Sequence, residues 1–287
     1  MDLGMLLEAI AYGLLSGGVY ALIGVGLNLI FGVMKIINFA HGSFLMLGMY
    51  CTYWLSIFFN IDPYVSLIIT IPFLFFIGII IQKFLINPII GYPEDNQLVL
   101  TMGVMLFLEN IALFLWGPDF RTVKVSYAGT VFPLFNIRLN ALRLIAFVGG
   151  LFLALILYIF LKKTDIGKAI RASSEEREGA YAVGINVKKI QLISFGIGTA
   201  CAGAAGTLIT PFFYISPTVG HLFLLTAFMV VVLGGMGSFF GAIFGGFIIG
   251  VMESLGAVIF PGSIGQIVPF SLFVIILLFK PKGLFMR

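Results

Sequence analysis

The sequence predicts an all-α polytopic membrane protein with about eight transmembrane helices. Hydrophobic residues make up 61% of its 287 residues and charged residues only 10%, which excludes an ordinary soluble domain. Apolar runs recur at about 20 residues, the length that a helix needs to cross a bilayer. Because these runs are continuous rather than alternating, a transmembrane β-barrel is not expected.

The first half of the chain contains four predicted spans, at residues 6–31, 44–59, 64–82 and 98–116. Residues 32–43 interrupt the apolar pattern and include Asn38, His41 and Ser43. This interruption is either a plain cytoplasmic turn or a broken helix, because irregular backbone at membrane depth is tolerated only where it lines a cavity or is buried in protein. A second polar loop is predicted at 83–97.

Two acidic residues fall within predicted spans, Glu109 in the fourth and Glu253 in a later one. An ionisable residue inside a span is a functional candidate by default. The alternative for Glu109 is a carboxyl group that faces the helix bundle and bonds to a neighbouring helix. No metal site is expected, since His41 and His221 are the only histidines and His41 has no cysteine or acid nearby.

Residues 117–142 form a long extracytoplasmic loop. Alternation in residues 122–127, followed by a turn at Ala128 and Gly129, predicts a small β-hairpin. This hairpin could contact a partner protein or simply decorate the surface.

The second half of the chain is predicted to span the membrane at 143–161, 190–210, 239–259 and 266–279. Residues 221–233 are too few for a full crossing. They predict a re-entrant half-helix that breaks at Gly234, Gly235, Gly237 and Ser238. The short matches HGSF at 41–44 and MGSF at 236–239 raise the alternative of an inverted repeat with a pathway between its halves.

The segment 162–189 is the most polar part of the chain, with seven Lys or Arg residues against four acids. It must lie in water, and its positive excess predicts a cytoplasmic location. Two short helices are expected, at 167–173 and 175–184. Ser174 is the expected N-cap of the second helix, and Gly184 its C-terminal stop.

The pattern E-G-A-x-x-x-G at 178–184 resembles the cytoplasmic E-A-A-x-x-x-G motif of ABC-importer permeases, although the I-x-L-P that follows in that family is absent. In that family the short helix docks into a groove of the ATPase subunit. The stretch N-F-A-H-G at 38–42 and the order of the spans extend the likeness. The whole chain, as one transmembrane permease domain over 1–287, resembles the permease subunits of branched-chain amino-acid ABC importers of the Liv type.

The resemblance implies a permease for branched-chain or other hydrophobic amino acids in the inner membrane of a prokaryote. Its implied partners are two ATP-binding subunits, a second homologous permease subunit in a homo- or heterodimer, an extracytoplasmic substrate-binding protein and the lipid bilayer. No nucleic acid is expected. The chain has no G-x-x-x-x-G-K-[ST], so we expect neither enzymatic activity nor a cofactor here, with ATP bound by the partner subunits.

Two sets of site residues follow from these observations. The set implied for ATPase coupling consists of Arg171, Glu175, Glu176, Arg177, Glu178, Ala180 and Gly184. The set expected along the translocation pathway consists of Asn38, His41, Ser43, Glu109, Gly234, Gly235, Gly237 and Ser238.

Other function classes remain open from the sequence. One is a secondary transporter driven by an ion gradient, with Glu109 or Glu253 as its coupling carboxylate. Another is a channel-like or purely structural membrane subunit. A third is an ABC permease for urea, amides or other amino acids.

Charge distribution predicts the orientation. Twelve Lys or Arg residues fall on the side of the segment 162–189 and four on the other, which places the N-terminus outside and the C-terminus in the cytoplasm. The cytoplasmic cations outside that segment are Lys35, Lys83, Lys280, Lys282 and Arg287.

We therefore expect cysteines placed at Ser174 and near Arg287 to be protected from a membrane-impermeant thiol reagent in intact cells. Both should react after the cells are opened. Strong labelling of Ser174→Cys in intact cells would reverse the orientation of every span.

Overall fold

The computed structural model describes residues 3–134, 137–260, 262–281 and 283–285. Two of the cations expected at the C-terminus, Lys282 and Arg287, lie outside these residues. The described chain forms eleven α-helices and one two-stranded antiparallel sheet. Their bounds are α1 Leu3–Met34, α2 His41–Phe59, α3 Leu67–Ile81, α4 Glu94–Trp116, β1 Val131–Leu134, β2 Ile137–Asn140, α5 Ala141–Lys163, α6 Asp165–Glu175, α7 Arg177–Ala182, α8 Val187–Ile209, α9 Gly220–Gly234, α10 Phe239–Ile259 and α11 Ile267–Phe279.

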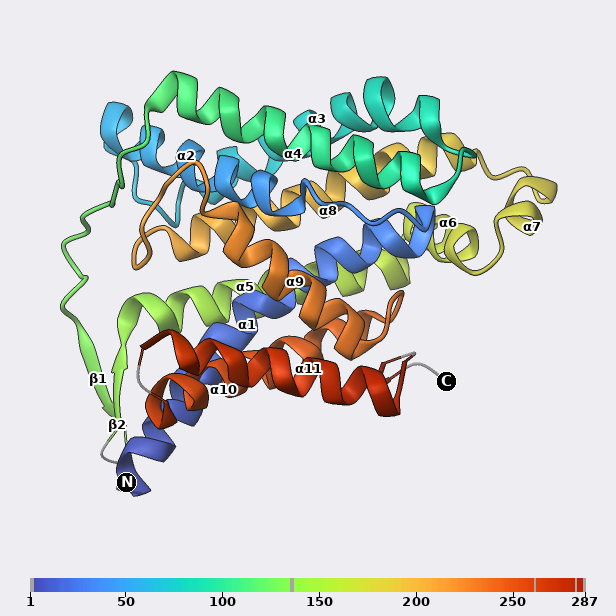
Figure 1. Cartoon of the computed structure of the whole chain (residues 1–287). Coiled ribbons are helices and arrows are strands. Elements are labelled where there is room, and N and C mark those ends of the chain that lie inside the picture. The colour runs from blue at the N-terminus through green and yellow to red at the C-terminus, as the bar shows by residue number, and fades with distance from the viewer. Residues whose placement is uncertain (1–2, 135–136, 261, 282, 286–287) are drawn as a thin grey trace.

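The helical fold class predicted from the sequence is confirmed. Seven described helices are long and apolar enough to cross a membrane, namely α1, α2, α3 with its continuation, α4, α5, α8 and α10. The helices α9 and α11 are apolar but shorter. Figure 1 shows α6 and α7 at one end of the molecule, which we call the charged end, and the β1–β2 hairpin at the other, the hairpin end. The two ends of the chain lie on opposite sides (Figure 1).

The polar loop predicted at 83–97 is much shorter, and only residues 90–93 are non-helical. The third span continues from α3 as a π-helical turn at Gln82–Ile86 and a 3-10 turn at Asn87–Ile89. The helix α4 begins after a connection of four residues, directly after Pro93, whose fixed φ suits a helix start. Lys83, Pro88 and the acids after Pro93 marked the whole stretch as a loop, but most of it is helical and Ile86 is buried against the bundle.

The segment 117–142 does contain a hairpin, but it is formed by β1 and β2 rather than by residues 122–127. The earlier segment is fixed at both of its ends. The backbone N–H of Arg121 donates to the carbonyl of Ile215, and the return bond is also made. The Tyr127 hydroxyl donates to Asp62 at 2.6 Å, and burial together with this carboxylate raises the pKa of Tyr127 above its usual range. Those contacts hold the segment against neighbouring loops instead of a strand partner.

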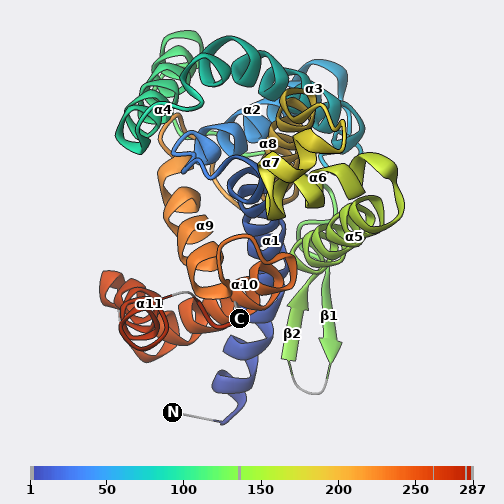
Figure 2. The same cartoon turned by 90° about the vertical axis from the view of Figure 1, so that its right-hand side faces the viewer.

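The helix α1 is the centre of the molecule, where it contacts α5, α8, α9 and α10 (Figure 2). Glycines allow the closest of these approaches. A Cβ at Gly13 would lie 2.5 Å from the backbone of Val251, and one at Gly17 would lie 2.8 Å from the backbone of Phe247. Small residues at four-residue spacing let two helices touch along their backbones, which drives helix association in lipid.

The interruption after α1 is a broken helix and not a plain turn. The His41 Nε2 atom at the start of α2 donates to the Ile23 carbonyl at 3.1 Å. Because Ile23 precedes the end of α1 by 11 residues, the linker runs back roughly 16 Å into the molecule before α2 begins. Its backbone groups find internal partners, since Thr101 Oγ1 donates to the Ile37 carbonyl at 3.1 Å and Asn38 Oδ1 accepts from the Ala40 N–H at 3.1 Å.

The half-helix α9 begins at the same depth. A Cβ at Gly42 would lie 2.1 Å from the carbonyl oxygen of Gly220, so the first turns of α2 and α9 are in direct backbone contact. From there α9 runs to the charged end, where the Leu284 N–H donates to the Leu233 carbonyl at 2.8 Å. The break at 234–238 therefore lies deeper toward the charged end than residues 41–44. The structural counterpart of the first interruption is the start of α9.

The packing of α2 against α8 generates a stability test. A Cβ at Gly48 would lie 2.4 Å from the carbonyl oxygen of Gly203, whereas nothing lies within 4 Å of one at Gly103 on α4. We expect Gly48→Ala to lower the free energy of unfolding by about 1–3 kcal/mol, since the helices must separate to admit the methyl group. Gly103→Ala is the matched control and should be neutral or stabilising, because alanine favours helix.

The measurement is the thermal midpoint of the purified protein in detergent. Equal midpoints for the two variants would show that the α2–α8 contact is not as tight as the structure indicates.

Candidate functional site

The charged segment 162–189 folds as two short helices, with caps that differ in part from those expected. The Thr164 hydroxyl caps α6 by accepting from the Gly167 N–H at 3.0 Å. Glu176 caps α7 by accepting from the Glu178 N–H at 3.3 Å. The prediction of Ser174 as N-cap is wrong, because its hydroxyl donates to the Arg171 carbonyl within the last turn of α6.

Gly184 ends this helical segment as predicted, with φ of 83°, a conformation in which glycine carries no steric penalty. Ala180 on α7 is only 3% exposed and therefore faces the rest of this chain. Val183 and Tyr181 instead point outward, at 75% and 46% exposure. The other coupling candidates, Arg171, Glu175, Glu176, Arg177 and Glu178, are all exposed.

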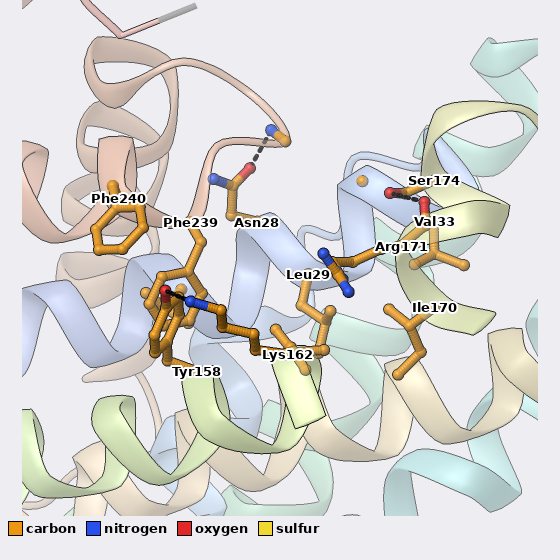
Figure 3. A pocket seen from close by; sticks show the side chains of 14 residues that line it. Asn28, Leu29, Val33, Tyr158, Lys162, Ile170, Arg171, Ser174, Phe239 and Phe240 are labelled. Atoms are coloured by element: carbon orange, nitrogen blue, oxygen red, sulfur yellow. Dashed lines mark hydrogen bonds between the residues drawn. The ribbon is translucent and has the colours of Figure 1, made fainter. Parts of the chain in front are cut away.

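A pocket of about 360 Å³ lies between α6 and the membrane helices (Figure 3). Its walls come from α1, α5, α6 and the start of α10. It is lined by Val25, Asn28, Leu29, Gly32, Val33, Tyr158, Leu161, Lys162, Ile170, Arg171, Ser174, Gly237, Phe239 and Phe240. The pocket thus brings together Arg171, from the set expected for ATPase coupling, and Gly237, from the set expected along the pathway.

Asn28 of α1 fixes the glycine loop, residues 235–238, that borders this pocket. Its Nδ2 donates to the Ser238 carbonyl at 2.7 Å and to the Gly235 carbonyl at 3.4 Å, and its Oδ1 accepts from the Gly237 N–H (Figure 3). The Ser238 hydroxyl then caps α10 by accepting from the Gly241 N–H at 3.1 Å. One amide side chain therefore connects α1 to the chain between α9 and α10.

The pocket carries positive charge and no acidic lining residue. Lys162 donates to the Tyr158 hydroxyl at 3.3 Å, and its amine lies 5.5 Å from the centre of the Tyr158 ring. Arg171 reaches toward the pocket from α6 (Figure 3). The helix α6 packs against both α1 and α5, so the charged segment contacts the helix whose Asn28 holds the glycine loop.

The remaining pathway candidates lie in two places. Asn38, His41 and Ser43 are buried at the start of α2, and each retains a polar side-chain atom without a hydrogen-bond partner. Glu109 lies on α4, where its carboxylate is 3.0 Å from His221 Nε2 of α9. The described residues therefore bring Glu109 together with the start of α9, while the glycine loop lies apart from both groups.

Sequence reasoning missed Asn28 and His221. Asn28 lies inside an apolar run and was not singled out. A lone amide in a span is costly unless it bonds to another helix, so its presence there could have marked it as a contact residue. His221 was noticed only as one of two histidines, since nothing in the sequence relates it to Glu109, 112 residues away. Among the residues that the structure describes, no group of three or more His, Cys, Asp or Glu could hold a metal ion.

Comparisons with known proteins agree with the architecture. The chain is 30% identical over 298 residues to the high-affinity branched-chain amino acid transport system permease protein BraD of Pseudomonas aeruginosa, covering 98% of this chain and 96% of that protein. It is 32% identical over 264 residues to a probable branched-chain amino acid transport permease protein LivH of Methanocaldococcus jannaschii, covering 88% of this chain and 82% of that protein.

A solved structure, PsaBC from Streptococcus pneumoniae in complex with Fab, contains a chain of similar fold. The TM-score is 0.51 at 16% identity, with 95% of this chain and 92% of that chain covered. The sequence profile of the family described as "Branched-chain amino acid transport system / permease component" matches residues 9–277. This chain belongs to that family of transport-system permease components.

Proposed function

We propose that this chain is the membrane-spanning subunit of an ATP-driven importer for branched-chain or other apolar amino acids. The observation that carries the proposal is the family match over nearly the whole chain, with relatives that are permeases of branched-chain amino acid transport systems. ATP would be bound and hydrolysed by separate subunits. Transport would proceed by alternating access, in which partners favour one of two conformations over the other.

The charged end is the proposed cytoplasmic face. Positive charge concentrates there, in accordance with the preference of Lys and Arg for cytoplasmic loops. The N-terminus would then be outside and the C-terminus inside. The hairpin end would meet an extracytoplasmic substrate-binding protein.

The helix α7 is the proposed docking point for an ATP-binding subunit. Its buried Ala180 anchors it to this chain, while Val183 and Tyr181 offer an apolar contact surrounded by exposed charges. A central apolar anchor with a charged rim is the usual anatomy of a protein interface. Two such subunits would serve two permease subunits.

The face that carries Glu109 and Asn110 on α4 and His221 on α9 is the proposed contact with the second permease subunit. Asn110 and His221 are exposed although they lie on apolar helices, and polar groups at membrane depth face a protein or a water-filled path rather than lipid. The chain is also 25% identical over 296 residues to the permease protein LivM of Escherichia coli, which supports a pair of homologous subunits.

The translocation pathway would then run along this subunit contact. The starts of α2 and α9, with Asn38, His41 and Ser43, lie at mid-depth, and the glycine loop lies at its cytoplasmic end. Neither Glu109 nor Glu253 needs to titrate in an ATP-driven cycle, which distinguishes this proposal from an ion-coupled carrier.

Val183→Glu tests the docking surface. A buried, unpaired carboxylate at the centre of the contact should weaken association of the ATP-binding subunits by about tenfold or more. Val131→Glu, the same change at an exposed position of the hairpin, is the matched control. Co-purification of the ATP-binding subunits and ATP-dependent uptake in vesicles are measured for both variants.

The control should retain the ATP-binding subunits, since it lies at the opposite end of the molecule. The thermal midpoint of Val183→Glu should equal that of the unmodified chain because the side chain is exposed. Full retention of subunits and transport by Val183→Glu would show that α7 is not the dock.

A further inference from the structure

A second and larger cavity opens at the hairpin end of the molecule, with a volume of about 800 Å³. Its walls are the first half of α1, the start of α5 and the ends of α8 and α10. It lies at the end of α1 opposite the pocket that contains Asn28. Nothing in the family match or in the coupling site accounts for it.

The cavity contains a guanidinium group whose position is fixed. Arg143 of α5 lies over the rings of Tyr12 and Phe212, at 5.2 and 5.4 Å from their centres. Its Nη1 donates to the Ser16 hydroxyl at 3.5 Å. These contacts orient the cation, and among the described residues it forms no ion pair.

Two carboxylates line the same cavity, Glu8 of α1 and Glu253 of α10. Glu253 of α10 is half-buried and lies beside the hydroxyl of Tyr20 on α1. The Glu253 carboxyl group is close enough to Arg143 for an electrostatic interaction, but the two groups do not form a salt bridge. Burying an acid and a base without a salt bridge between them costs free energy within apolar helices. That cost indicates a ligand that bridges the two groups.

The rest of the cavity wall is mostly apolar. Phe212, Phe213 and Phe223 contribute aromatic rings, and Val19 and Ile209 contribute aliphatic groups. A site that separates a cation from an anion beside such a wall is complementary to a small molecule with both charges and a hydrocarbon side chain.

We propose that this cavity is a binding site for one zwitterionic α-amino acid with an apolar side chain. Arg143 binds the carboxylate, Glu253 binds the ammonium group, and the phenylalanines contact the side chain. This inference rests on the proposed function, and it adds that the permease itself selects its substrate at the hairpin end. An amino acid released by a binding protein at that end would enter this cavity first.

The test measures equilibrium binding of radiolabelled L-leucine to the assembled transporter in lipid nanodiscs, without ATP and without the binding protein. Competition uses isocaproate, which lacks the ammonium group, and isoamylamine, which lacks the carboxylate. The variants are Arg143→Gln and Glu253→Gln. The matched controls are Lys124→Gln and Asp119→Asn, which change exposed charges outside the cavity.

Each cavity variant should weaken leucine binding by about tenfold or more, because a charge-assisted contact is lost. The relative affinities of leucine and its two analogues distinguish the loss of one contact from misfolding. Arg143→Gln should remove the higher affinity of leucine relative to isoamylamine, because the carboxylate site is lost. Glu253→Gln should remove the higher affinity of leucine relative to isocaproate, because the ammonium site is lost. Both controls should bind leucine as the unmodified transporter does.

The inference is overturned if both cavity variants bind leucine like the controls, or if a transporter that imports leucine with ATP binds none without the binding protein. Failure of the proposed function has a different signature. In that case the unmodified transporter shows no ATP-driven uptake of any apolar amino acid, whatever the cavity binds.

Discussion

The close approach of helix backbones along α1 is the interaction on which the rest of the structure depends. In lipid no hydrophobic force draws one apolar helix to another, so association relies on van der Waals contact and on hydrogen bonds between helices. Gly13 and Gly17 supply that contact to α10, and Gly26 supplies it to α8 through the carbonyl of Gly198. A larger side chain at any of these positions would separate the helices that form both cavities.

The same helix also joins the two cavities. Asn28 holds the glycine loop at the charged end, while Tyr12, Ser16 and Tyr20 line the cavity at the hairpin end. Because the glycines of α1 let it pack backbone to backbone against α10, this pair of helices extends without a break from the contact with α6 to the cavity at the hairpin end.

Composition and spacing predict much of this architecture, because the hydrocarbon core imposes a length and a polarity on each span. The bounds of α10 and the half-helix α9 follow from glycine and apolar run length alone. The strands were misplaced because Arg121 and Tyr127 bond to distant loops. The helical continuation over 83–89 was missed because its polar residues mask the burial of Ile86. Asn28, Arg143 and Glu253 acquire their significance only from neighbours on other helices, which a linear pattern cannot show.

The backtracking linker between α1 and α2 constrains how the protein is made. The carbonyl of Ile37 receives its hydrogen bond from Thr101, which the ribosome adds 64 residues later. In hydrocarbon no water can bond to that carbonyl, so the linker has this backbone group satisfied at its buried position only when α4 is in place. The native contact between α1 and α2 therefore depends on a helix that is synthesised after both of them.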